Sequence, residues 1–204
     1  MGSDGRGADD STNGYRVMKR VGASPATFIA FGLSDDDSSK NVGFIRSTDG
    51  GVTWQQFAPE LRELHISVFT VSPDGNTIYA NEGGTYGGWI SRNAGASWTM
   101  GPTIQVNGPV AISPANSSLV LFGSTSRGIL RSANGLQSAQ SVLSEPVPAG
   151  YSDTTQFRDI VFAPSNPNIV YAEADGYLLY RSDDAGVTWR FLVNGRDDVL
   201  NAQP

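Results

Sequence analysis

Short runs of β-branched and aromatic residues, separated by Gly, Pro, Asn and Asp, cover most of the chain. The pattern is clearest near the C-terminus, where four apolar runs follow one another at 160–163, 169–172, 177–181 and 189–193. Apolar runs of four or five residues bounded by turn-forming residues are typical of β-strands. This part of the chain therefore predicts four consecutive strands joined by short turns.

The same order of strands recurs in three earlier segments. The four segments are 15–57, 65–101, 105–143 and 156–193. Only residues 59–64 indicate a helical turn, which is too short to change the class. The sequence therefore predicts an all-β fold of four four-stranded antiparallel blades, which form part of a β-propeller.

A repeated motif supports this division. Ser-x-Asp/Asn-x-Gly-x-Ser/Thr-Trp occurs between the predicted third and fourth strands at 47–54, 91–98 and 182–189. A fourth copy begins at Ser132, keeps Asn134 and has Ala139 where Trp is expected. The four motif serines lie 44, 41 and 50 residues apart along the chain. That period is typical of a four-stranded propeller blade.

A second motif is in register with the first. A small residue followed by Pro precedes each copy, at 24–25, 72–73, 113–114 and 163–164. The proline lies 18 residues before the motif serine in the last three segments and 22 residues before it in the first. Two separate motifs with a constant offset indicate a true structural repeat.

The chemistry of the repeated motif indicates a structural role. Ser hydroxyls and Asp carboxylates accept hydrogen bonds from backbone N–H groups of their own turn. Gly supplies the positive φ that such a turn requires, and Trp can bury its ring between neighbouring blades. We therefore assign a structural role to Ser47, Asp49, Gly51, Trp54, Ser91, Asn93, Gly95, Trp98, Ser132, Asn134, Ser182, Asp184, Gly186 and Trp189.

The four motifs resemble Asp-box (BNR) repeats. The blades are similar to those of sialidase-like propellers, sortilin-type receptors and xyloglucan-cleaving glycoside hydrolases, over residues 15–193. The resemblance implies that the boxes lie away from any active site. It also implies rings of six, seven or ten blades, so four blades form an arc. Three explanations are open. The chain is a piece of a longer protein, which we favour, or it closes into a small four-bladed ring, or a second copy completes the arc.

The two ends of the chain lack apolar periodicity. Residues 1–14 consist almost entirely of Gly, Ser, Asp, Asn and Arg, and they predict a flexible tail. Residues 194–204 predict a linker after the last blade. The expected organisation is thus a tail at 1–14, a propeller segment at 15–193 and a linker at 194–204.

Charge and composition exclude several functions. A net charge of −6 disfavours binding to nucleic acid, and no apolar run is long enough for membrane insertion. With no Cys and one His, thiol catalysis and Cys-based zinc sites are excluded. We expect no metal site and no cofactor. An extracellular or periplasmic location is favoured, although residues 1–6 do not read as a signal peptide; the alternative is the cytosol.

The functional residues are expected on the face opposite the boxes, where the connections between second and third strands and between blades lie. Candidate ligand contacts on this face are Glu82, Tyr86, Trp89, His65, Arg127, Arg158 and Tyr151. Residues expected to line the central channel are Lys19, Arg20, Ser67, Gly108, Arg158 and Asp159. An acid beside a channel can serve as a general acid or base. For this catalytic role Asp159 is the first candidate, followed by Asp153 and Asp175.

Two functional hypotheses follow, and a third, an assembly factor or sortilin-like receptor section that recognises a peptide, fits the blades equally well. The first is a scaffold that binds a glycan or protein ligand and is non-catalytic by itself. The second is a fragment of a glycoside hydrolase, which needs two carboxylates about 5 to 10 Å apart. The resemblance to xyloglucan-cleaving enzymes implies that these acids come from two propellers facing one cleft. It also implies that a sialidase would need an arginine cluster and an Arg-Ile-Pro tripeptide, and the tripeptide is absent.

Overall fold

The computed structural model describes residues 14–21, 26–33, 42–64, 66–82, 88–101, 108–124, 128–143, 156–174 and 178–194. These residues form four antiparallel sheets, each built from four strands that are consecutive in the chain. This topology confirms the predicted all-β class and the predicted up-and-down blades.

The strand bounds follow the predicted segments. Blades 1 and 2 contain β1 (Gly14–Val21), β2 (Thr27–Leu33), β3 (Gly43–Ser47), β4 (Gln55–Phe57), β5 (Val68–Val71), β6 (Ile78–Asn81), β7 (Gly88–Ser91) and β8 (Thr99–Met100). Blades 3 and 4 contain β9 (Val110–Ile112), β10 (Val120–Ser124), β11 (Gly128–Ser132), β12 (Gln140–Leu143), β13 (Phe157–Ala163), β14 (Asn166–Ala174), β15 (Leu178–Ser182) and β16 (Arg190–Asn194).

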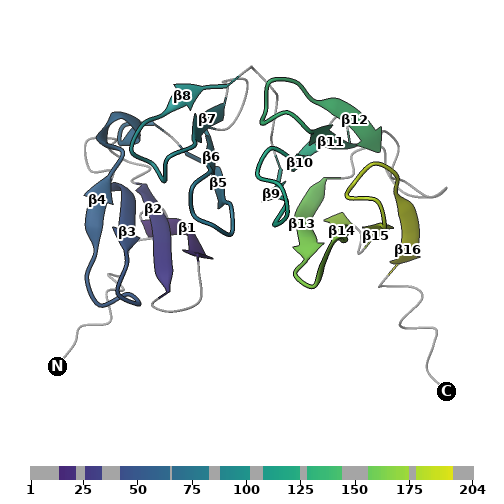
Figure 1. Cartoon of the computed structure of the whole chain (residues 1–204), viewed down its shortest axis with the longest axis horizontal. Helices are drawn as coiled ribbons and strands as arrows, with labels where there is room; N and C mark the ends of the chain where they lie inside the picture. Colours follow the sequence, from purple (N-terminus) through teal and green to yellow (C-terminus); the bar gives the residue numbers. More distant parts are fainter. Residues whose placement is uncertain are drawn as a thin grey trace.

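The blades are arranged side by side in an arc (Figure 1). The first strand of each blade, β1, β5, β9 or β13, faces the middle of the arc, and the fourth strand lies on its rim. Each innermost strand contacts the innermost strand of the next blade. All four blades therefore contribute residues to one central axis.

The hydrophobic core lies at the junctions between blades. One buried cluster joins blades 1 and 2, a second joins blades 2 and 3, and a third joins blades 3 and 4. In the first cluster the centre of the Phe44 ring lies 4.7 Å from that of Phe31 and 5.2 Å from that of Phe69 in the next blade. Within the described part of the chain, no cluster joins blade 4 back to blade 1.

The helical turn predicted after blade 1 is present as the 3₁₀ helix η2 (Pro59–Leu61). Leu61 is fully buried in the cluster between blades 1 and 2, so this turn anchors the connection to β5. Among the described residues, no helix has the length and apolar character that crossing a membrane requires.

Candidate functional site

The four boxes share one hydrogen-bonding pattern. The Ser hydroxyl donates to Oδ1 of the Asp or Asn two residues later, at 2.7 Å in the first and last boxes and 3.0 Å in the other two. The same Ser oxygen accepts the backbone N–H four residues later, at 2.7 to 3.0 Å. Where Trp is present, its Nε1–H donates at 3.1 to 3.2 Å to the carbonyl three residues earlier. The side chains that define the motif thus bond within their own turn.

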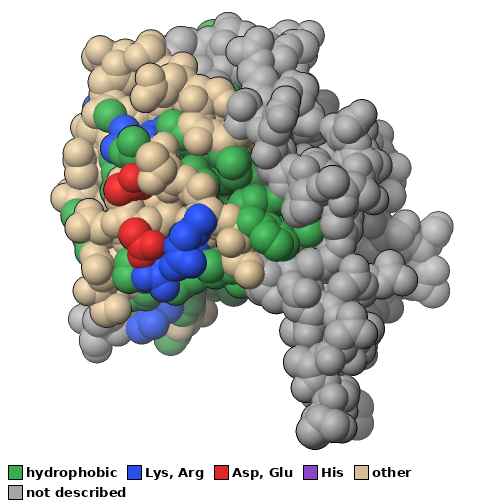
Figure 2. Space-filling view, turned by 90° about the vertical axis from the view of Figure 1, so that its right-hand side faces the viewer, with side chains coloured by type: hydrophobic (Ala, Val, Ile, Leu, Met, Phe, Trp, Pro, Cys, Tyr) green, Lys and Arg blue, Asp and Glu red, His purple; other side chains and the backbone are tan. Residues whose placement is uncertain are grey.

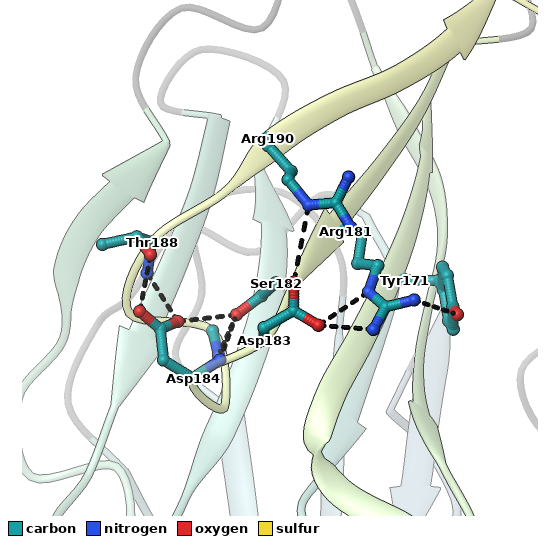
Figure 3. Close-up of polar contacts among 8 residues, drawn as sticks. Tyr171, Arg181, Ser182, Asp183, Asp184, Thr188 and Arg190 are labelled. Atoms are coloured by element: carbon teal, nitrogen blue, oxygen red, sulfur yellow. Dashed lines mark hydrogen bonds and ion pairs between the residues drawn. The ribbon is translucent and has the colours of Figure 1, made fainter.

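These bonds keep the box carboxylates ionised. Hydrogen bonds from the Thr53 hydroxyl and amide and from Ser47 hold the pKa of Asp49 far below its usual value. Burial raises the pKa of Asp184, but hydrogen bonds from Thr188, Ser182 and the Val187 amide outweigh it and lower the pKa to about 2 (Figure 3). A carboxylate held in this way is a poor proton donor or acceptor near neutral pH.

The boxes lie at one end of the blades. In each blade, the backbone N–H of the fourth box residue donates to a carbonyl in or next to the turn between first and second strands, for example Ala94 to Asn76 at 2.8 Å. The two kinds of turn therefore share one face. The other connections belong to the opposite face, and most of their residues lie outside the described ranges.

A cavity of about 390 Å³ lies where the four innermost strands meet. Its walls are formed by Lys19, Ser67, Val68, Phe69, Gly108, Pro109, Val110, Gln156, Phe157, Arg158 and Asp159. Ser67 and Gln156 directly precede β5 and β13. Both strands begin at these residues and end at the turns beside the boxes. Ser67 and Gln156 therefore lie at the end of the cavity that is farther from the boxes.

The polar lining combines two cations with one acid. Lys19, Arg158 and Asp159 are exposed, and Asp159 Oδ1 accepts the backbone N–H of Ile160 at 2.8 Å. Among the described lining residues, Asp159 is the only carboxylate. The described part of the chain also has no group of three or more His, Cys, Asp or Glu side chains suited to a metal ion. The cavity can donate and accept hydrogen bonds.

The structure brings two of the candidate site residues, Arg158 and Asp159, to this cavity. Glu82 follows the end of β6 and is half-buried. Trp89, on β7, packs against the cluster between blades 1 and 2, and its buried Nε1–H has no partner among the described residues. The candidates outside the described ranges are His65, Tyr86, Arg127, Tyr151, Asp153 and Asp175.

Sequence reasoning missed one polar residue of the cavity, Gln156. The signal was its place directly before a predicted innermost strand, the same place that Ser67 occupies in blade 2. It also missed the arginines that lie beside the box serines, whose contacts reach the next blade.

Comparison with protein families finds a BNR/Asp-box repeat at residues 45–56. No curated protein matches the chain. Several solved structures have the same fold. An ancestral GH74 enzyme is 22% identical to this chain, with a TM-score of 0.58. The match covers 92% of this chain and 25% of the enzyme's chain. The Niastella koreensis GH74 enzyme is 18% identical with a TM-score of 0.58, covering 90% and 32%.

The GH74 xyloglucanase from Xanthomonas campestris is 18% identical with a TM-score of 0.56, covering 86% of this chain and 29% of its own. The chain therefore spans between a quarter and a third of the length of these relatives. At such low identity the likeness shows the fold alone. The chain thus has the β-propeller fold and carries a BNR/Asp-box repeat at residues 45–56, and its blades resemble those of GH74 enzymes in fold.

Proposed function

We propose that this propeller segment is a binding module that holds a neutral glycan chain at the mouth of its axial cavity, on the face opposite the Asp boxes. The observation that carries the proposal is the mixture of hydrogen-bonding groups from four blades around one cavity of about 390 Å³. Sugar hydroxyls both donate and accept hydrogen bonds. A carboxylate, a guanidinium and an amide in one cavity satisfy both needs.

The walls of the cavity suit the apolar faces of a sugar ring. Val68 and Pro109 line the cavity beside the polar groups. Both are half-buried, so each leaves some apolar surface for a ligand to contact. Ligand sites generally combine an apolar wall with a few oriented polar groups. One of the fold relatives is a xyloglucanase, so xyloglucan oligosaccharides are the first glycans to test.

The same cavity supports binding better than hydrolysis. Glycoside hydrolysis needs an acid and a second carboxylate across the bond. Within the described residues, the cavity has the carboxylate of Asp159 alone. Asp159 then acts as a hydrogen-bond acceptor for ligand hydroxyls, and Arg158 beside it acts as a donor.

The test is calorimetric titration of the 204-residue chain with xyloglucan oligosaccharides. We expect saturable binding that weakens at least about tenfold in Asp159→Ala and in Arg158→Ala, the loss of about 1.4 kcal/mol that one or two charged hydrogen bonds provide. Gln137→Ala is the matched control, because this exposed side chain lies in the third box at the other end of the blades. Its affinity should equal that of the parent chain.

Two results would contradict the proposal. Absence of binding to neutral glycans, with binding of a peptide ligand at the same residues, would replace the glycan by a protein partner. Release of sugar fragments by the purified chain, abolished in Asp159→Ala, would replace binding by hydrolysis.

A further inference from the structure

The three junctions between blades share one polar contact. At each of them an arginine of one blade donates to the carbonyl of the fourth box residue of the next blade. The pairs are Arg46 with Ala94, Arg92 Nη2 with Gly135 at 2.6 Å, and Arg131 Nε with Ala185 at 3.1 Å. A blade therefore presents an arginine to the blade that follows it, and a box carbonyl to the blade that precedes it.

The box also packs closely on the preceding blade. A Cβ added to Gly95 would lie 2.5 Å from the Phe57 ring of blade 1, and one added to Gly186 would lie 2.7 Å from Leu121 of blade 3. In contrast, a Cβ added to Gly51, in the first box, would meet no described residue within 4 Å. The glycine of the first box thus lacks the close neighbour that its equivalents have.

The rest of the first box is also uncovered. We define this box face by Gly50, Gly51 and Trp54. Gly50 is the fourth box residue, equivalent to those whose carbonyls accept from an arginine, and Trp54 is 39% exposed. Trp98 of the second box is instead half-buried, stacked 5.5 Å from Phe44 of the preceding blade.

Blade 4 presents the opposite half of a junction. We define its outward face by Val161, Tyr171, Arg181 and Arg190, which are paired across β13, β14, β15 and β16. Arg181 directly precedes its box serine, as Arg46 and Arg131 do. It donates to Asp183 and, from Nη1, to the Tyr171 hydroxyl at 3.2 Å (Figure 3).

This face combines charge with apolar surface. Val161 is 47% exposed, and the Arg190 side chain is 58% exposed while its Nε lies 3.4 Å from Asp183. On the side of the molecule where blade 4 lies, Figure 2 shows cationic and acidic side chains beside hydrophobic ones. An exposed valine beside a half-buried tyrosine, edged by charges, suits an interaction surface.

The geometry points to a head-to-tail association of two copies of this chain. The box face of blade 1 in each copy seats on the outward face of blade 4 in the other, and Arg181 donates to the carbonyl of Gly50 in the second copy. The contact repeats the arrangement already present at the three internal junctions.

The two surfaces are complementary in charge, and their pairing closes a ring. The outward face carries Arg181, Arg190 and their shared partner Asp183, which leaves one net positive charge, and the box that it receives carries the ionised Asp49. A two-fold axis along the central cavity relates the copies, so both ends of each arc are covered and no blade face is left over. Four blades from each copy give a ring at the upper end of the usual range of blade numbers.

The test is sedimentation equilibrium of the 204-residue chain over concentrations up to about 100 μM. We expect a reversible species of twice the 21.6 kDa mass of one chain. Arg181→Glu and Trp54→Ala should each raise the dissociation constant at least about tenfold. Met100→Ala is the control, because Met100 is 64% exposed on the rim of blade 2, away from both faces.

A mixing experiment distinguishes head-to-tail from other dimers. In a ring of two copies, each contact contains one box face and one outward face. Mixing Arg181→Glu with Trp54→Ala gives a heterodimer with one intact contact, so the mixture should associate more tightly than either variant alone. Circular dichroism of each separate variant verifies that it remains folded.

A chain that stays at 21.6 kDa over this range would overturn the inference. A dimer that neither substitution weakens would also overturn it. So would a mixture of the two variants that associates no better than its components.

Discussion

The backbone amide of Leu136 donates to the Ser132 hydroxyl at 3.0 Å while Leu136 holds a φ of 72°. The other three boxes place glycine at this position. Leu136 is 3% exposed and packs in the cluster between blades 2 and 3, beside Ala139, which stands where the other boxes have Trp. We interpret the strained leucine as a partial replacement for the missing ring.

If Leu136 replaces the missing tryptophan, the effects of Leu136→Gly and Ala139→Trp on stability should depend on each other. Leu136→Gly relieves about 1 kcal/mol of left-handed strain but loses about 2 to 3 kcal/mol of buried side chain, so the free energy of unfolding should fall by about 1 to 2 kcal/mol. Ala139→Trp alone overpacks the site and should cost about 1 to 3 kcal/mol. The double variant should be more stable than either single variant.

Urea denaturation of the four proteins measures the coupling. If the two losses simply add, Leu136 does not substitute for the tryptophan, and our interpretation of the third box is wrong.

The acid stability of the protein should depend on Asp184. Its folded pKa of about 2 lies below the usual 3.8, so its contribution is complete above about pH 4 and is lost as the pH falls towards 2. Asp184→Asn keeps the Oδ1 acceptor, as Asn93 does in the second box, and removes the titration. The melting temperature of this variant should fall less steeply between pH 4 and pH 2.

Asn93→Asp is the converse control for this effect. The Ser97 hydroxyl can then donate to the new carboxylate, as Thr188 does to Asp184. Its melting temperature should fall more steeply over the same pH range. Parallel pH profiles for all three proteins would contradict the role assigned to the box carboxylate.

Two box glycines should respond differently to alanine. Gly95 has a φ of 84°, and an added Cβ would clash with Phe57 of blade 1, so Gly95→Ala should cost about 2 to 4 kcal/mol in strain and overpacking. Gly50 has a φ of 77°, but an added Cβ would meet no described residue within 4 Å, and Ala185 already occupies its position in the fourth box with a φ of 55°. Gly50→Ala should therefore cost only about 1 kcal/mol, the left-handed strain alone. Thermal unfolding of the two variants compares them, and equal losses would show that the junction is not tightly packed there.

Phe44 should stabilise two blades together. Its ring lies 5.4 Å from Phe57 of its own blade and 5.5 Å from Trp98 of blade 2. Phe44→Ala should cost about 3 to 5 kcal/mol, and amide exchange should quicken in blades 1 and 2 before blade 4. Phe191→Ala, which removes a ring that is 41% exposed, should cost less. Uniform loss of protection over all four blades would mean that the propeller opens as one unit.

The sequence predicts the blades well because their determinants are local. The side chains that define each box bond within eight residues, and paired strands follow one another in the chain, so spacing alone places the repeats. The cavity depends instead on the convergence of innermost strands that are far apart in the chain. The repeat topology is enough to predict Lys19, Ser67, Gly108, Arg158 and Asp159 in its lining, but not Gln156. The placement of the junction arginines is also variable, since Arg92 follows its box serine while Arg131 precedes one. No local pattern shows that both reach the next box.

The hydrophobic clusters are shared by adjacent blades, and this has an evolutionary consequence. A tandem duplication of one repeat adds four strands and one complete interface in the same event, so the longer gene product gains stability as it gains length. A single substitution inside a cluster lowers the stability of two neighbouring repeats. On these energetics, a whole repeat can be added without weakening the repeats already present, whereas an exchange inside a cluster weakens two of them.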